Sequence, residues 1–186
     1  MKQPLPTYVI RDGLPADIDR CTAISHTYET DNVWQMSIRQ DMSSWQISFR
    51  TEHLPRTVHA THEPAASRLR RAYDQPENCF LVAVEKDGDS LFGYLTLRTE
   101  AAYGAAFVQD IVVEYPFRRQ GIATRLLLVA ERWAAEQGLR RVFFETETHN
   151  YPSILFAQQR GYHLCGFNDQ AYPNNNIAVY FGKPIR

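Results

Sequence analysis

The sequence predicts an α+β fold with a mixed, mainly antiparallel central sheet and flanking helices. Residues 79–98 contain two β-rich runs on either side of Asp87-Gly88-Asp89, and this hairpin signal predicts antiparallel neighbours. Residues 107–147 read as strand, helix and strand, and a right-handed crossover makes those two strands parallel neighbours. The 186 residues are enough to bury one hydrophobic core, so we expect a single domain over residues 7–186.

The first third of the chain predicts a short strand, a helix and a hairpin. TYVIRDG is a strand closed by a turn, and Pro15 occupies the first position of a helix that we expect to reach about Tyr28. VWQMSI and SWQISF both alternate apolar and polar residues, which predicts a hairpin over about 31–63 that carries Trp34 and Trp45. A short helix, PAASRLRRAYDQP, follows between two prolines.

The last two thirds carry the elements that matter most for function. FVQDIVV (107–113) and RRVFFETET are strands, and the helix between them, residues 121–137, has apolar residues at helical spacing. Those residues are Ile122, Leu126, Val129, Ala130 and Trp133. Asn150 and Pro152 begin a short helix that stops at Gly161, and YHLCGF and NIAVYFG end the chain as strands.

Composition excludes several classes of function. A net charge of -1 and the lack of a basic stripe give no reason to expect a nucleic acid partner. No apolar stretch approaches the length of a membrane span, so we expect no membrane association. Three separated cysteines without a CxxC predict free thiols in a reducing, cytoplasmic compartment. HATHE (59–63) has no second ligand pair, so we expect no metal.

The turn RRQGIATRLL, at the carboxyl end of the strand 107–113, predicts an anion site. The first amides of a helix have no intrahelical partner, and the helix dipole adds positive potential there. Gly121 allows close approach of an anion, while Arg118 and Arg119 add charges with bidentate geometry. Together these features suit a pyrophosphate, although the stretch is neither a P-loop nor a Rossmann fingerprint, and a merely charged turn is the alternative.

Two motifs in order make this turn more specific. DIVVEYPFRRQGIATRLL resembles the acyl-CoA-binding segment of the GNAT superfamily of N-acyltransferases, in which Arg118, Gly121 and Ala123 fill the fixed positions. ETETHNYPSILFAQQRGY resembles the second GNAT motif, with Asn150 at the helix start and Gly161 before an aromatic residue. The segments WQISFRTEHLPR, QDIVV, ETETHN and GFNDQAYPNNNIAVYFGK are most similar to the streptothricin acetyltransferase subgroup.

The resemblance implies a GNAT fold, with a splayed parallel strand pair at the cofactor cleft, and acetyl-CoA as co-substrate. It implies main-chain contacts to the pantetheine and a backbone oxyanion donor at Val113, since oriented amides stabilise a developing oxyanion. The implied cofactor-binding residues are Ile111, Val112, Val113, Arg118, Arg119, Gln120, Gly121, Ile122, Ala123, Thr124, Asn150 and Ser153.

The residues that move protons are less clear from the sequence. An alkylamine with a pKa of about 10.4 needs a base at pH 7 more than a thiolate leaving group of about 8.5 needs an acid. Glu145 and Asp110 interrupt apolar strands and are candidates for the base or for amine binding. Structural hydrogen bonding by Asp110 and an arginine partner for Glu145 are the alternatives. Ala157 stands where many GNAT members carry the proposed acid, a tyrosine, so Tyr162, another hydroxyl, water or an unassisted thiolate remain open.

The resemblance implies direct attack of a primary amine on acetyl-CoA in a ternary complex, without a covalent enzyme intermediate. A small cationic acceptor such as streptothricin is the first hypothesis, which would make the chain an antibiotic-resistance enzyme. Acetylation of a protein or peptide amine, and a non-catalytic acyl-CoA-binding module, are the alternatives. We expect the hairpin at 31–63 to be an insertion on the substrate side. The acceptor and the oligomeric state are not decided, and a homodimer is open.

Overall fold

The computed structural model describes residues 6–172 and 176–185, so Pro173–Asn175 of the tail segment and Arg186 lie outside the described residues. The chain divides into two compact units. The first comprises His62–Phe144 together with the chain ends up to His26 and from Gly182, and the second comprises Thr27–Thr61 and Glu145–Phe181. The expectation of a single domain over residues 7–186 stays a prediction.

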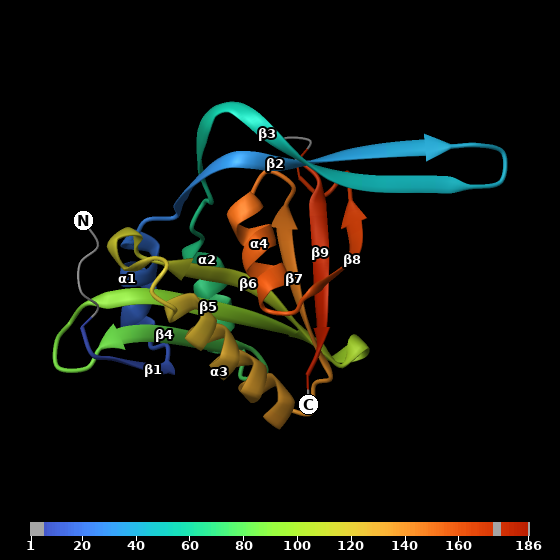
Figure 1. The fold of residues 1–186 in the computed structure, drawn as a ribbon. Coiled ribbons are helices and arrows are strands. Elements are labelled where there is room, and N and C mark those ends of the chain that lie inside the picture. Colours follow the sequence, from blue (N-terminus) through green and yellow to red (C-terminus); the bar gives the residue numbers. More distant parts are fainter. Residues whose placement is uncertain (1–5, 173–175, 186) are drawn as a thin grey trace. The chain divides into compact units, whose positions relative to one another are not determined.

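The first unit contains a twisted sheet with strand order β1-β4-β5-β6-β7 (Figure 1). Its strands are β1 (Tyr8–Asp12), β4 (Cys79–Glu85), β5 (Leu91–Glu100), β6 (Ala105–Val113) and β7 (Arg141–Glu147), of which β7 contributes its first four residues to this unit. Strands β1, β4, β5 and β6 pair antiparallel, while β6 and β7 pair parallel. The mixed, mainly antiparallel α+β fold and the hairpin around Asp87-Gly88-Asp89 are therefore confirmed.

Three helices pack on the two faces of this sheet (Figure 1). Apolar side chains of α1 (Pro15–Ala23) and α2 (Ala66–Asp74) form one core cluster with β4 and β5. Helix α3 (Ile122–Glu136) packs on the opposite face and buries Ile122, Leu126, Leu127, Ala130 and Ala134. Val129, expected on the buried face, is 40% exposed because the buried stripe passes through Leu127 and Ala134 instead.

Helix α1 is shorter than the sequence suggested. It ends at Ala23 rather than near Tyr28, because Ile24 is already extended and Thr27 begins the next strand. Residues that the sequence assigned to the last helical turn instead satisfy their backbone groups by cross-strand pairing, from Thr27 with Thr61 onward. Two short 3₁₀ turns, Ala101–Tyr103 and Tyr115–Phe117, were not predicted.

Strands β6 and β7 pair along only part of their lengths. The parallel register runs from Ala105 with Arg141 to Val108 with Phe144, whereas β6 continues to Val113. At the point where the register ends, the β5–β6 pairing shifts, which leaves Gln109 as the extra residue of a bulge. A bulge increases the local twist and ends regular pairing, so this shift explains why the parallel register stops at Val108, and the splay of the pair stays a prediction.

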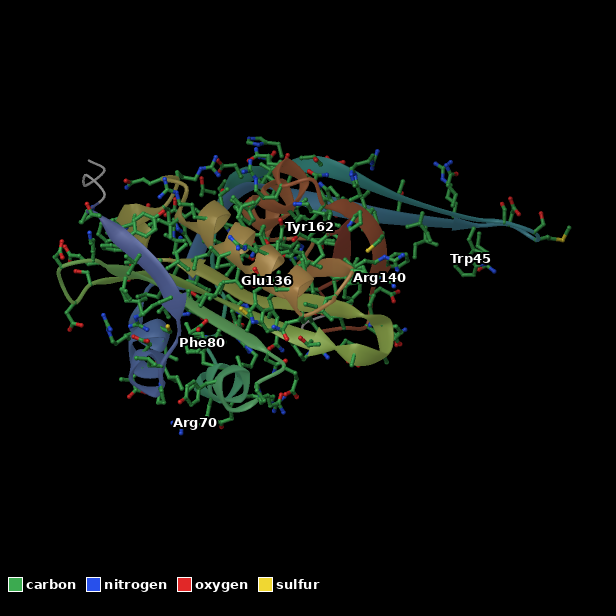
Figure 2. The ribbon with its side chains drawn as sticks, turned by 90° about the horizontal axis from the view of Figure 1, so that it is seen from below. Trp45, Arg70, Phe80, Glu136, Arg140 and Tyr162 are labelled. Atoms are coloured by element: carbon green, nitrogen blue, oxygen red, sulfur yellow. The ribbon has the colours of Figure 1, made fainter. Side chains whose placement is uncertain are left out.

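The second unit is organised around a long two-stranded ribbon. Strands β2 (Thr27–Gln40) and β3 (Trp45–Thr61) pair antiparallel, which confirms the predicted hairpin and extends it at its amino-terminal end. Trp34 packs against the rings of Phe49 and Phe181 at 5.5 and 5.7 Å, which connects the middle of the ribbon to β9 (Ala178–Pro184). Figure 2 shows Trp45 near the turn end of the ribbon, where its side chain is 63% exposed.

The rest of the second unit contains the last residues of β7, helix α4 (Tyr151–Gln159), β8 (His163–Asn168) and β9 (Ala178–Pro184). The strand order here is β7-β9-β8. Backbone hydrogen bonds from Trp34 N–H to Thr148 O and from Thr148 N–H to Ile177 O join the ribbon, the end of β7 and the segment before β9. The two closing strands predicted from YHLCGF and NIAVYFG are confirmed.

Candidate functional site: the start of helix α3 and the carboxylates of β6 and β7

Helix α3 begins with backbone geometry that suits an anion. Its N-cap, Gly121, has φ 87° and provides no capping side chain. Arg119, two residues earlier, has φ 61°, an uncommon conformation for a residue with a Cβ atom. Left-handed residues in a turn direct successive N–H groups toward one concave side, as in anion-binding nests.

The first amides of α3 lack protein acceptors. Among the residues that the structure describes, the N–H groups of Ile122, Ala123 and Thr124 donate to no protein atom. Helix α4 differs, because the side chain of Asn150 accepts from Ser153 N–H at 3.2 Å. A Cβ atom built on Gly121 would meet no protein atom within 4 Å, so there is open space beside these amides. The start of α3 therefore offers both the donors and the room that a phosphate group needs.

Arg118 holds the turn in place rather than extending into solvent. Its Nε donates to Val113 O at 2.7 Å, and its Nη2 donates to Ser25 O at 2.7 Å. Its guanidinium also lies 5.2 Å from the ring centre of Tyr115. These contacts fix the shape of the turn, while Arg119 is exposed, and the predicted contribution of both arginines to a diphosphate site stays a prediction.

The other residues predicted to bind the cofactor in this unit lie on β6 and along the turn. Ile111, Val112 and Val113 are half-buried and lie beyond the last residue of β6 that pairs with β7. Gln120 donates from Nε2 to Pro116 O at 3.2 Å. Main-chain contacts from Ile111 to Val113, and the oxyanion donor at Val113, stay predictions.

Asp110 on β6 is a buried, ion-paired carboxylate. Its side chain is 1% exposed and accepts from Arg68 Nη2 and Thr96 Oγ1, both at 3.0 Å, with His62 Nε2 at 3.4 Å. Burial alone would raise the pKa of Asp110, but His62 and Arg68 outweigh it and hold the pKa below its ordinary value. Such a carboxylate is a weak base, so its surroundings favour the structural alternative.

Sequence reasoning missed the partners of Asp110. Arg68 lies 42 positions away on α2, and His62 lies in the loop before that helix. His62 Nε2 also lies 3.1 Å from Arg68 Nη2, so the imidazole contacts both members of the ion pair. No local spacing connects these residues, so the cluster had no detectable sequence signal.

Glu145 on β7 has different surroundings. It is exposed, and its Oε1 accepts from the hydroxyl of Tyr172 at 3.0 Å. Glu147, two residues further along the strand and therefore on the same face, accepts from Asn176 Nδ2 at 2.6 Å. Among the described residues neither carboxylate forms an ion pair, so both remain uncompensated negative charges. The arginine partner considered for Glu145 is not found among the residues that the structure describes.

The second GNAT-like segment forms the predicted short helix. Asn150 caps α4, and its side-chain oxygen accepts the hydrogen bond from Ser153 N–H. Ala157 is fully buried in α4, and Tyr162 is only 1% exposed. A buried phenol is poorly placed to protonate a thiolate, so the weak acid assignment of Tyr162 gains no support and stays a prediction.

Two further histidines, His59 and His149, give no indication of a functional site. His59 Nδ1 lies 3.5 Å from Glu29 Oε1 across the ribbon, and His149 is exposed.

Within residues 6–172 and 176–185, no helix is long and apolar enough to cross a membrane. All three cysteines are free, with Cys21 and Cys79 buried and Cys165 exposed.

Comparison with known proteins identifies the family. Residues 39–162 match the Acetyltransferase (GNAT) family, a span that includes β6, the turn, α3 and α4. The chain belongs to the GNAT acetyltransferase family. It is 30% identical over 118 residues to the aminoglycoside N(6')-acetyltransferase type 1 of Klebsiella aerogenes, covering 61% of this chain and 77% of that relative.

Further GNAT relatives include streptothricin acetyltransferases. The Escherichia coli protein of that name is 30% identical over 81 residues, or 41% of this chain, and the match spans only 47% of its length. The crystal structure of nourseothricin acetyltransferase aligns with a TM-score of 0.83 at 23% identity, covering 96% of this chain and 99% of that one. A Bacillus anthracis protein in complex with acetyl coenzyme A aligns with a TM-score of 0.79 at 19% identity, covering 96% and 100%. These structures support the GNAT fold.

Proposed function

We propose that this GNAT protein is an acetyl-CoA-dependent N-acetyltransferase that modifies a primary amine of a small cationic molecule. The acetyl thioester supplies an activated acyl group, and the chain supplies binding, orientation and a path for the amine proton. Nitrogen forms a bond to the acetyl carbon as the carbon–sulfur bond breaks, and a proton passes from the amine to a base. The neighbouring structure in complex with acetyl coenzyme A supports this choice of co-substrate.

The start of α3 carries this proposal. Three amides without acceptors, a glycine cap in the left-handed conformation and open space beside it match the requirements of a diphosphate. We assign the diphosphate to Gly121–Thr124 with Arg119 alongside, and the pantetheine to the unpaired part of β6. A binding site built from backbone amides tolerates many side chains, which is consistent with Ala123 as the third fixed residue of the motif.

The charge of Glu145 and Glu147 supports a cationic acceptor. Neutral donors hold both carboxylates, so an incoming ammonium group would find negative charge that no protein cation neutralises. Relatives named for streptothricin and aminoglycosides support the same acceptor class, since their names refer to polycationic antibiotics. We therefore assign amine binding, and the base, to Glu145 in preference to Asp110.

Two other functions compete with this proposal. Acetylation of a protein or peptide amine is compatible with the fold shared with the ribosomal-protein-S18-alanine N-acetyltransferase of Escherichia coli, which aligns with a TM-score of 0.65 at 12% identity, covering 96% and 94%. A non-catalytic acyl-CoA-binding module is supported by Ala157 at the usual position of the acid. Thiol release from acetyl-CoA, measured with streptothricin, an aminoglycoside, a diamine and an amino-terminal peptide, separates the three. Turnover with the small cations is expected, whereas tight binding without turnover would indicate the module.

A pair of glycine variants tests the diphosphate assignment. Gly121 and Gly138 cap opposite ends of α3, both have positive φ, and a Cβ on either meets open space. Gly121→Trp and Gly138→Trp should each lose about 1–2 kcal/mol of stability from the strained backbone. Only Gly121→Trp should abolish the heat of CoA binding in calorimetry. If Gly121→Trp binds CoA as tightly as Gly138→Trp does, the diphosphate site does not lie at the start of α3.

Location and assembly remain predictions. The free cysteines support a reducing, cytoplasmic compartment. The homodimer that the sequence left open is checked by light scattering of the purified chain.

A further inference from the structure

A tyrosine that the sequence interpretation did not select contacts the proposed base. Tyr172 lies in the loop between β8 and β9, 27 positions from Glu145, and both belong to the second unit. Its hydroxyl is 3.0 Å from Glu145 Oε1. Among the described residues it is the one protein donor to that carboxylate.

The direction of this hydrogen bond is fixed by chemistry. Burial, followed by the charge of Glu145, raises the pKa of the Tyr172 hydroxyl above its ordinary value. The phenol consequently keeps its proton at neutral pH and donates it to the carboxylate. A phenol that holds its proton so firmly is also a poor general acid for the departing thiolate.

A single neutral donor orients a carboxylate without neutralising its charge, which an arginine partner would do. Arg68 approaches Asp110 with two nitrogens and neutralises it, whereas Tyr172 engages only Oε1 of Glu145 and leaves its charge intact. The other oxygen of this exposed side chain has no donor among the described residues. Asn176, from the same loop, holds Glu147 in the same neutral way.

We propose that Tyr172 is a positioning residue, which fixes the side chain of Glu145 so that Oε2 receives the N–H of the acceptor amine. This inference rests on the proposed N-acetyltransferase function. Without the hydroxyl, the exposed glutamate samples several rotamers, and fewer of them accept from the bound amine. The binding of acetyl-CoA does not depend on this contact.

A double-mutant cycle with Tyr172→Phe, Glu145→Gln and both together tests the proposal in the thiol-release assay. Tyr172→Phe should lower kcat/KM for the amine about tenfold, as expected for a hydrogen bond to a charged group, without changing the KM for acetyl-CoA. In the Glu145→Gln background the same change should have no further effect. Tyr103→Phe is the control, because the exposed Tyr103 has no contact with Glu145 among the described residues and should keep wild-type kinetics.

Each outcome has a separate meaning. An additive loss in the double variant, or wild-type kinetics for Tyr172→Phe, overturns the positioning role while the acetyltransferase function stands. A changed KM for acetyl-CoA in Tyr172→Phe would indicate a general structural defect and equally overturns it. Absence of turnover by the wild-type protein with every amine rejects the proposed function itself, and the inference with it.

Discussion

Strands β6 and β7 each carry a carboxylate in an apolar run, yet the two carboxylates have opposite surroundings. Asp110 on β6 is buried and ion-paired with Arg68, and His62 lies beside it. Glu145 on β7 is exposed and has only a neutral hydroxyl as partner. An acidic residue that interrupts a strand is therefore not by itself a sign of catalysis. The partner of the carboxylate determines whether it can bind a substrate, because a protein cation neutralises the negative charge that would otherwise attract a substrate ammonium group.

Replacing Glu145 should produce the largest effect on activity. Glu145→Gln keeps the shape and the contact to Tyr172 but removes the charge and the basic oxygen. We expect kcat/KM to fall about 100-fold or more, the range for loss of a general base, while the stability of this exposed site changes little. Steady-state kinetics and urea unfolding measure the two quantities. Activity within twofold of wild type would contradict the distinction between the two strands.

Asp110→Asn should have the reverse pattern. Removing a buried charge from an ion pair destabilises the fold, and we expect a loss of about 3 kcal/mol, the lower end of the usual range, because Arg68 is 33% exposed and can turn toward water. Acetyl-CoA affinity of the folded variant should equal that of the wild type. A variant as stable as wild type but inactive would instead make Asp110 the functional carboxylate.

The pH dependence of stability in acid should show a smaller effect of Asp110, which further distinguishes its ion pair from the neutral contact of Glu145. The pKa of Asp110 is lower in the folded chain than its ordinary 3.8, so the unfolded chain binds a proton first as the pH falls. Its stabilisation is therefore complete above about pH 5 and is lost as the pH drops below 4 toward the folded-state pKa. Urea unfolding at several pH values should show wild type and Asp110→Asn converging below pH 4. A constant difference down to pH 3 would argue against the ion pair.

The smallest expected effect concerns the charge of Glu147. Burial first, and the Glu147 charge second, raises the pKa of Tyr28 to about 12. Glu147→Gln removes only the second cause, so the pKa should fall slightly and stay above the ordinary 10.0. Titration of ¹³C-labelled tyrosines by NMR measures it, with Tyr28→Phe identifying the resonance. An unchanged pKa would mean that Glu147 carries no uncompensated charge.

The sequence predicted the order of elements well because local signals control them. Alternation and Asp87-Gly88-Asp89 predicted hairpins, and the apolar spacing after Gly121 predicted α3. The end of α1 was wrong by several residues, since pairing of Thr27 with Thr61 across the ribbon outweighs the helical tendency nearby. Long-range pairing of this kind leaves no mark in a local window.

For the candidate site, backbone features could be predicted from the sequence, whereas the environments of the side chains could not. The local sequence determines the backbone geometry at the start of α3, because a glycine cap, a short turn and a helix start are all encoded within a few neighbouring residues. The different surroundings of Asp110 and Glu145 are decided by the tertiary structure alone. Folding brings Arg68 to one carboxylate and Tyr172 to the other over 42 and 27 positions, and electrostatic environment depends on distance in space rather than in sequence.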